Sequence, residues 1–202
     1  MITIIDYGMG NLGSIENMLK RIGAATKISS NINDIQQAEK ILLPGVGAFD
    51  AAMQRIDELG LREVLTNKAN VDKVPFLGIC LGMQLLTNSS EEGILQGLGL
   101  IDADTLKFEF DDRTLKIPHM GWNFAHPKND SPLTEGFTEE FRFYFVHSYY
   151  VKCDNPNDIV MQTEYGGRFD SIIQRGNIYG AQFHPEKSHK YGMKLLENFS
   201  KI

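Results

Sequence analysis

The chain has few cysteines, no run of basic residues and no long apolar stretch, and each shortage excludes a class of protein. Only 2 of its 202 residues are cysteine, without the spacing of a metal site or a disulfide framework, so we expect a reducing compartment, the cytoplasm. The net charge is −6 and no Lys/Arg cluster is present, which argues against nucleic-acid binding. No apolar run is long enough to span a membrane, and residues 1–6 do not form a signal peptide.

The residues that are present fit a globular protein with one domain, residues 1–202. The hydrophobic content is 42% and the aromatic content 10%, which is ordinary for a chain that buries a core. A length of 202 residues is sufficient for a substantial core without a second domain. No cofactor or metal is expected, because neither a metal-ligand cluster nor a nucleotide-phosphate motif occurs.

Short apolar strands alternate with amphipathic helices in the first half of the chain. This pattern predicts strands over residues 2–5, 25–28, 40–43 and 74–79. It predicts helices over residues 12–22 and 49–65, the second broken near Gly60. The second half predicts strands over residues 105–110, 115–117, 141–146, 159–163, 171–174 and 178–183, then a helix over 188–199. We expect an α/β fold: a mostly parallel central sheet with helices on both faces, plus an additional antiparallel or mixed strand layer.

The segment 78–82 (GICLG) is the most informative motif. It joins a predicted strand to a helix-like run, which is the context of a nucleophile elbow with Cys80 as the nucleophile. Gly78 and Gly82 permit the sharp turn, and the start of a helix favours a thiolate. A buried cysteine in an ordinary strand–helix turn fits this single motif equally well.

A catalytic cysteine needs a base, and the base needs an orienting group. His184 lies just beyond a predicted strand, and Glu186 follows two residues later. In an extended chain such residues point to the same side, so Glu186 would fix the imidazole of His184. The alternative is a strand-end histidine beside a solvated glutamate.

Acyl transfer also needs donors for a developing oxyanion. The amide of Leu81 is one candidate, and an amide of Val46 or Gly47 in the turn 44–47 (PGVG) is the other. Because the carboxyl ends of parallel strands meet at one edge of a sheet, this turn and Cys80 are expected to be neighbours. An ordinary strand–helix loop has the same composition.

Taken together, the segments 78–84, 44–47 and 183–186 resemble the triad-type, class I glutamine amidotransferases. The resemblance covers essentially the whole chain and identifies residues 1–202 as one type-1 glutamine amidotransferase domain. It implies hydrolysis of L-glutamine through a thioester, with Cys80, His184 and Glu186 as the catalytic triad.

The same resemblance assigns glutamine binding to Gln84, Glu92, Ser148 and Tyr149. Gln84 lies four residues after Cys80, on the same face of a helix; it could equally be a polar residue at a helix start. The neighbouring Glu91 leaves open which of the two glutamates contacts the substrate ammonium.

Further segments, 6–12, 118–123, 145–149 and 187–188, narrow the resemblance to glutaminases that form a heterodimer with a (βα)8-barrel cyclase in histidine biosynthesis. A tight complex would carry ammonia to the cyclase without protonation in bulk water. Asn11, Trp122 and Lys187 are the interface candidates, although a core tryptophan and a solvated lysine fit nearly as well. The remaining histidines, at positions 119, 126, 147 and 189, are interpreted as structural because no acid is paired with them at a suitable spacing, and Cys153, near a turn, is interpreted as incidental.

Three alternatives remain. The stretch 188–194 is similar to paralogues that supply ammonia for the amidination of a surface-polysaccharide sugar. Another cysteine hydrolase would share the sheet and the triad but would not need segments 6–12 and 118–123. A silent scaffold for a barrel partner would not need an intact triad.

Overall fold

The computed structural model describes residues 1–111, 114–137 and 141–202. The strands are β1 Ile2–Ile5, β2 Thr26–Ser29, β3 Ile41–Gly45, β4 Phe76–Cys80, β5 Ser89–Ser90, β6 Ala103–Lys107, β7 His119–Phe124, β8 His126–Pro127, β9 Arg142–His147, β10 Tyr149–Cys153, β11 Ile159–Glu164, β12 Arg168–Arg175 and β13 Ile178–Ala181. The helices are α1 Leu12–Arg21, α2 Ile32–Gln36, α3 Phe49–Glu58, α4 Leu61–Asn70, α5 Leu81–Leu85 and α6 His189–Lys201, with 3-10 turns η1 Pro132–Thr134, η2 Pro156–Asp158 and η3 Pro185–Lys187.

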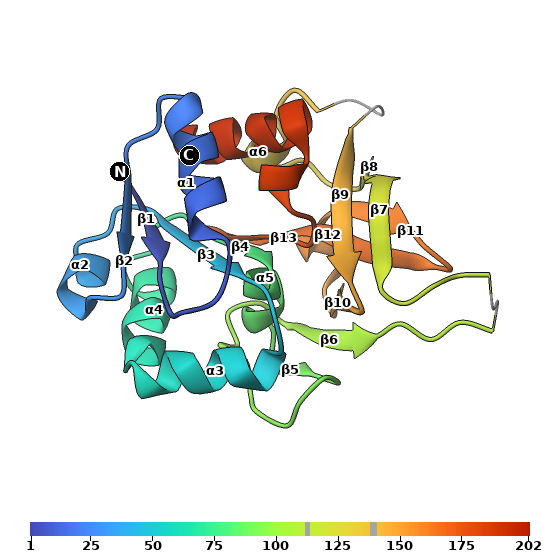
Figure 1. Ribbon diagram of the computed structural model, residues 1–202, viewed down its shortest axis with the longest axis horizontal. Helices are drawn as coiled ribbons and strands as arrows, with labels where there is room; N and C mark the ends of the chain where they lie inside the picture. Colours follow the sequence, from blue (N-terminus) through green and yellow to red (C-terminus); the bar gives the residue numbers. More distant parts are fainter. Residues whose placement is uncertain (112–113, 138–140) are drawn as a thin grey trace.

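One long mixed sheet organises the molecule (Figure 1). Its first part is parallel, in the order β2-β1-β3-β4-β13. The sheet then continues through the antiparallel strands β12, β10 and β6. Strands β7 and β9 form a separate antiparallel ribbon. The additional strands are therefore partly an extension of the same sheet and partly this ribbon.

Helices cover both faces of the parallel part (Figure 1). One face packs against α1 and α6, which contribute Ile15, Leu19, Leu195 and Phe199 to a buried cluster. The other face packs against α3, α4 and α5, and the fully buried Phe49 lies in that second cluster. Among the described residues, no helix is both long and apolar enough to cross a membrane. The predicted α/β fold with a mostly parallel sheet is confirmed.

The strand predicted over residues 115–117 is wrong. Those residues form bends without regular structure, and the strand of this region is β7, His119–Phe124. Its pattern is inverted relative to an ordinary surface strand: Met120, Trp122 and Phe124 are exposed, whereas the ring of His119 is buried. Apolar alternation therefore did not mark β7 as a strand with a buried apolar face.

Candidate active site

Cys80 ends β4 and immediately precedes α5. Its φ of 54° is in the left-handed region, which a residue with a side chain adopts only under local constraint, as in a nucleophile elbow. Both flanking glycines are needed sterically. A Cβ on Gly82 would collide with the carbonyl oxygen of Leu43, and one on Gly78 would lie 2.5 Å from the carbonyl oxygen of Gly82.

The glycine-rich turn lies beside the elbow. Gly45 at the end of β3 is the register partner of Cys80 in the adjacent parallel strand. Val46, Gly47 and Leu81 line the same cavity as Cys80, with a volume of about 350 Å³. Leu81 is the first residue of α5, where amide N–H groups lack partners within the helix. The residues expected to bind an oxyanion are thus brought together.

His184 and Glu186 are paired, but not in the expected extended geometry. The His184 Nδ1 lies 2.8 Å from Glu186 Oε1, and both side chains are buried. Residues 185–187 form the 3-10 turn η3, with Pro185 at its first position. The fixed φ of proline suits the start of such a turn, so Glu186 reaches the ring because the chain curls back.

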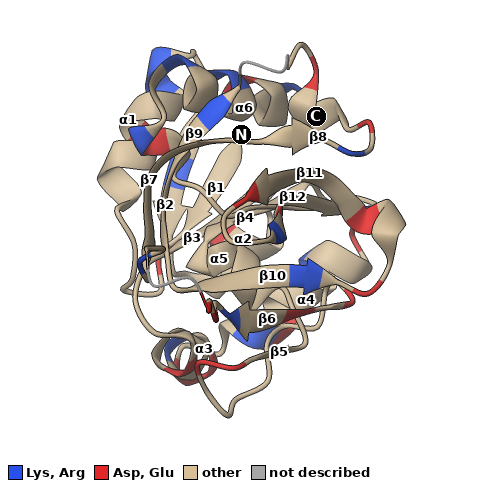
Figure 2. Ribbon diagram, turned by 90° about the vertical axis from the view of Figure 1, so that its right-hand side faces the viewer, with Lys and Arg blue, Asp and Glu red and all other residues tan. Residues whose placement is uncertain are grey.

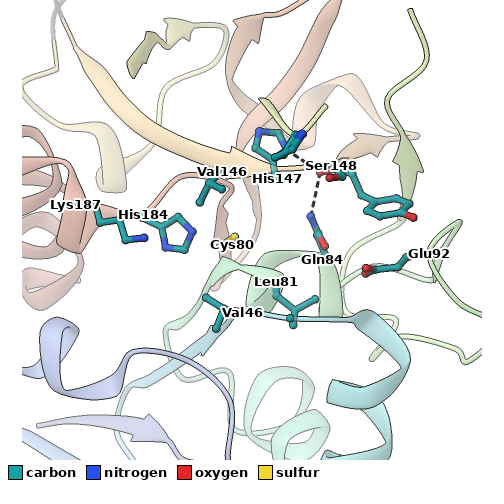
Figure 3. Close-up of a pocket in the computed structure, with 13 residues that line it drawn as sticks. Val46, Cys80, Leu81, Gln84, Glu92, Val146, His147, Ser148, His184 and Lys187 are labelled. Atoms are coloured by element: carbon teal, nitrogen blue, oxygen red, sulfur yellow. Dashed lines mark hydrogen bonds between the residues drawn. The ribbon is translucent and has the colours of Figure 1, made fainter. Parts of the chain in front are cut away.

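The electrostatics of the site favour an imidazolium. Burial by itself lowers the pKa of His184, but hydrogen bonding to Cys80 and Glu186, together with their negative charges, outweighs burial and raises this pKa to about 10. His184 therefore carries a proton at neutral pH beside the sulfur. Figure 3 shows Cys80 between His184 and Gln84.

The cavity distinguishes the two adjacent glutamates. Glu92 lines it and accepts a hydrogen bond from the amide of Phe49 at 2.9 Å. Glu91 is exposed and accepts from the amide of Lys107 at 2.6 Å instead. Glu92 is thus the glutamate that faces the pocket.

Gln84, Ser148 and Tyr149 line the other side of the cavity. The Gln84 Nε2 donates to the Tyr149 carbonyl at 3.1 Å (Figure 3). His147, which the sequence interpretation left as structural, also lines the cavity, and its Nδ1 lies 2.7 Å from the same carbonyl oxygen.

The three interface candidates lie at the surface. Trp122 is 42% exposed and stacks on His189, with the ring planes at 2° and the centroids 5.6 Å apart. Lys187 is exposed on the cavity rim, with its Nζ 5.8 Å from the ring centroid of Tyr144. Asn11 is exposed and caps α1 by accepting from the amide of Ser14.

Sequence reasoning missed two buried polar residues near Cys80. The Tyr7 hydroxyl donates to the carbonyl of Pro44 at 2.8 Å, at the start of the glycine-rich turn. The Gln182 Nε2 lies 3.8 Å from Cys80 Sγ and donates to it. Gln182 is two residues before His184, and strand alternation could have placed both on the side of the nucleophile; no sequence signal identified Tyr7.

Comparison with protein families matches residues 3–202 to glutamine amidotransferase class-I. The chain is 55% identical to imidazole glycerol phosphate synthase subunit HisH 2 of Methanococcus maripaludis, over 100% of this chain and 99% of that protein. It is 52% identical to subunit HisH 2 of Pseudomonas aeruginosa, over the full length of both. It is 46% identical to subunit HisH of Bdellovibrio bacteriovorus, again over both full lengths.

Solved structures share the fold at low sequence identity. The structure of PurLQS from Thermotoga maritima superposes with a TM-score of 0.72 at 19% identity, covering 98% of this chain and 96% of that chain. The glutaminase domain of Trypanosoma brucei CTPS, with bound acivicin, gives 0.65 at 14% identity, covering 99% of this chain and 93% of that chain.

Proposed function

The chain belongs to the class-I glutamine amidotransferase family, and from that premise we propose that it is the glutaminase subunit of imidazole glycerol phosphate synthase. It hydrolyses glutamine to glutamate and ammonia, which a cyclase subunit uses in histidine biosynthesis. The observation that carries this proposal is the pocket that Cys80 and His184 line together, with the Nδ1 of His184 held 2.8 Å from Glu186 Oε1.

The mechanism starts from the thiolate of Cys80 and the imidazolium of His184. The sulfur attacks the side-chain amide carbon of glutamine, and the amides of Leu81 and of Val46 or Gly47 stabilise the oxyanion. As the C–N bond breaks, His184 gives its proton to the departing ammonia. The neutral imidazole then takes a proton from water, which hydrolyses the γ-glutamyl thioester and restores the thiolate.

Recognition of the amino-acid end of glutamine is assigned to the far side of the pocket. Glu92 would pair with the α-ammonium, because only one of its oxygens is used by the amide of Phe49. Gln84 would accept from the same ammonium, and the backbone at Ser148 and Tyr149 would hold the α-carboxylate. These roles rest on the resemblance and on the position of the residues around one cavity.

We propose that the partner is a cyclase of the (βα)8-barrel type, bound over the exposed face of β7. Met120, Trp122 and Phe124 form an apolar stripe there, and Figure 2 shows β7 without Lys, Arg, Asp or Glu. Such a stripe beside the pocket rim suits a permanent partner.

A cytoplasmic location is proposed because both cysteines are free thiols.

The test is glutamate release from glutamine by this chain mixed with the (βα)8-barrel cyclase encoded in the same genome. We expect strong stimulation by the ribulosyl formimino ribotide substrate of the histidine pathway, and loss of activity in Cys80→Ala. Turnover in Cys80→Ala near the wild-type rate would refute the assigned chemistry.

A second candidate acceptor is a surface-polysaccharide sugar. It rests on the similarity of the stretch 188–194 to paralogues that supply ammonia for such an amidination, whereas the relatives named above are all subunits of imidazole glycerol phosphate synthase. Glutaminase activity that depends on Cys80 but ignores the histidine-pathway ligand would favour this acceptor over the main proposal.

A further inference from the structure

Gln182 is a fully buried amide behind the nucleophile. It follows β13, whose residues Gly180 and Ala181 pair in register with Gly78 and Ile79 of β4, so it lies level with Cys80. Its backbone amide donates to the carbonyl of Ser171 on β12 at 3.0 Å. A buried side-chain amide is costly unless its own donors and acceptor have partners.

A chain of hydrogen bonds fixes the orientation of this amide. The Tyr149 carbonyl only accepts, so Gln84 must present its nitrogen there, at 3.1 Å. The same nitrogen lies 3.2 Å from the Gln182 Oε1, which therefore must be the oxygen. The Gln182 NH2 group is then directed at Cys80 Sγ, 3.8 Å away.

The same series of hydrogen bonds fixes the orientation of the Gln84 side-chain amide. Both N–H groups of its amide are used, by Tyr149 and by Gln182. Its oxygen accepts no hydrogen bond from the described residues, and Gln84 lines the cavity. The amide therefore offers the pocket an acceptor, which suits an ammonium group and not a carboxylate.

We propose that Gln182 is a catalytic residue of this glutaminase, which stabilises the Cys80 thiolate through its amide N–H and orients Gln84 toward the ammonium of glutamine. The proposal rests on the proposed function and adds a residue that links substrate recognition to the nucleophile. The N–H bond to sulfur is strongest while sulfur carries the charge, that is, before attack and after thioester hydrolysis. Gln182 gives up no proton; the proton delivered to ammonia comes from His184.

Two substitutions separate the two contacts. Gln182→Met keeps the length of the side chain and removes both hydrogen bonds, whereas Gln182→Glu keeps the acceptor for Gln84 and replaces the donor at sulfur by a carboxyl oxygen. Ser171→Ala is the matched control, because its buried hydroxyl has no hydrogen-bond partner in the described residues and lies one strand away. Its removal should leave the site unchanged.

The readouts use the full chain and two probes. Iodoacetamide measures thiolate reactivity at Cys80, resolved from Cys153 by peptide mass, from pH 6 to 9. The glutamine analogue 6-diazo-5-oxo-norleucine measures reactivity that also requires recognition of the amino acid. At pH 7 we expect both Gln182 variants to react with iodoacetamide about tenfold more slowly, from the loss of a hydrogen bond to a charged group.

The rate profile of both variants is expected to shift to higher pH. The half-saturating concentration of the analogue is expected to rise in Gln182→Met and to stay near the wild-type value in Gln182→Glu. Iodoacetamide rates equal to those of Ser171→Ala across the pH range would overturn the proposal. If the wild-type chain itself showed no saturable labelling of Cys80 by the analogue, the glutaminase function would fail instead, and the two failures are therefore distinguishable.

Discussion

Glu91 and Glu92 are identical side chains at adjacent positions with different surroundings. The carboxylate of Glu92 is drawn to the start of α3 by the Phe49 amide and faces the pocket. That of Glu91 is bound outside the pocket by the amide of Lys107. The hydrogen-bond donors supplied by distant segments, and not the residue type, decide which of the two carboxylates faces the pocket.

Glu92→Gln should therefore raise the KM for glutamine about tenfold or more with a smaller change in kcat, because a charged partner of the ammonium is lost. The side-chain amide oxygen that Glu92→Gln introduces can still accept from the amide of Phe49, so the fold should be retained. The control is Glu91→Gln, for which steady-state kinetics should give the wild-type KM. A raised KM in the control alone would reverse the assignment of the two glutamates.

The elbow between β4 and α5 works as a packed element. Three backbone segments meet there: the end of β3, the end of β4 and the first turn of α5. The absence of a Cβ at Gly82 lets the carbonyl of Leu43 approach the helix. The same close packing places Gly45 beside Cys80. A side chain added at Gly82 would therefore disturb both the position of Cys80 and the glycine-rich turn.

Gly82→Ala is expected to lower the free energy of unfolding by about 3 kcal/mol or more, since the added methyl group meets backbone and not a flexible side chain. The matched control is Gly13→Ala in α1, where a Cβ would meet nothing within 4 Å. That change should be neutral or stabilise by up to about 1 kcal/mol, because alanine is the better helix former. Equal urea midpoints for the two variants would contradict the packing argument.

The β7–β9 ribbon is joined to the main sheet through two buried histidines. His119 Nδ1 lies 3.1 Å from His147 Nε2, and His147 in turn contacts the Tyr149 carbonyl at the start of β10. Burial lowers the pKa of His119 to about 4. Burial, opposed by the bond to the Tyr149 carbonyl, lowers the pKa of His147 to about 3. Both rings are therefore neutral in the folded chain at neutral pH.

The sign of the pH dependence follows from these shifts. Between pH 6.5 and about 4 the unfolded chain binds protons that the folded chain excludes, so stability present above pH 6.5 is lost as the pH falls. His184 has the opposite shift: its contribution is complete below pH 6.5 and is lost as pH rises through about 10. Between pH 6.5 and about 4, a change in the free energy of unfolding therefore reports on His119 and His147 and not on His184.

Urea unfolding of the wild type and of His119→Gln, from pH 7 to pH 4.5, tests whether the buried, neutral His119 contributes to this pH dependence of stability. The wild-type free energy of unfolding should fall more steeply, by up to about 1.4 kcal/mol per pH unit, because the variant has one titrating group fewer. Parallel curves for the two proteins would show that His119 is not held neutral by the fold.

Local sequence patterns predicted Cys80 as the nucleophile and His184 as its base, and they were sufficient to place most of the parallel half of the fold. Cys80 between two glycines, and His184 two residues before Glu186, are local patterns whose chemistry depends on neighbours along the chain. The same is true of β1, α1 and the break at Gly60, where periodicity and turn residues act within a few positions.

Tertiary structure alone decided which distant residues meet. It replaced the strand predicted over residues 115–117 by β7, whose pairing with β9 outweighs its inverted apolar pattern. It selected Glu92 over Glu91, and it brought Gln182 against Cys80. The physical reason is that a side chain's partner across strands is set by register and by the packing of segments far apart in sequence, which short-range patterns do not encode.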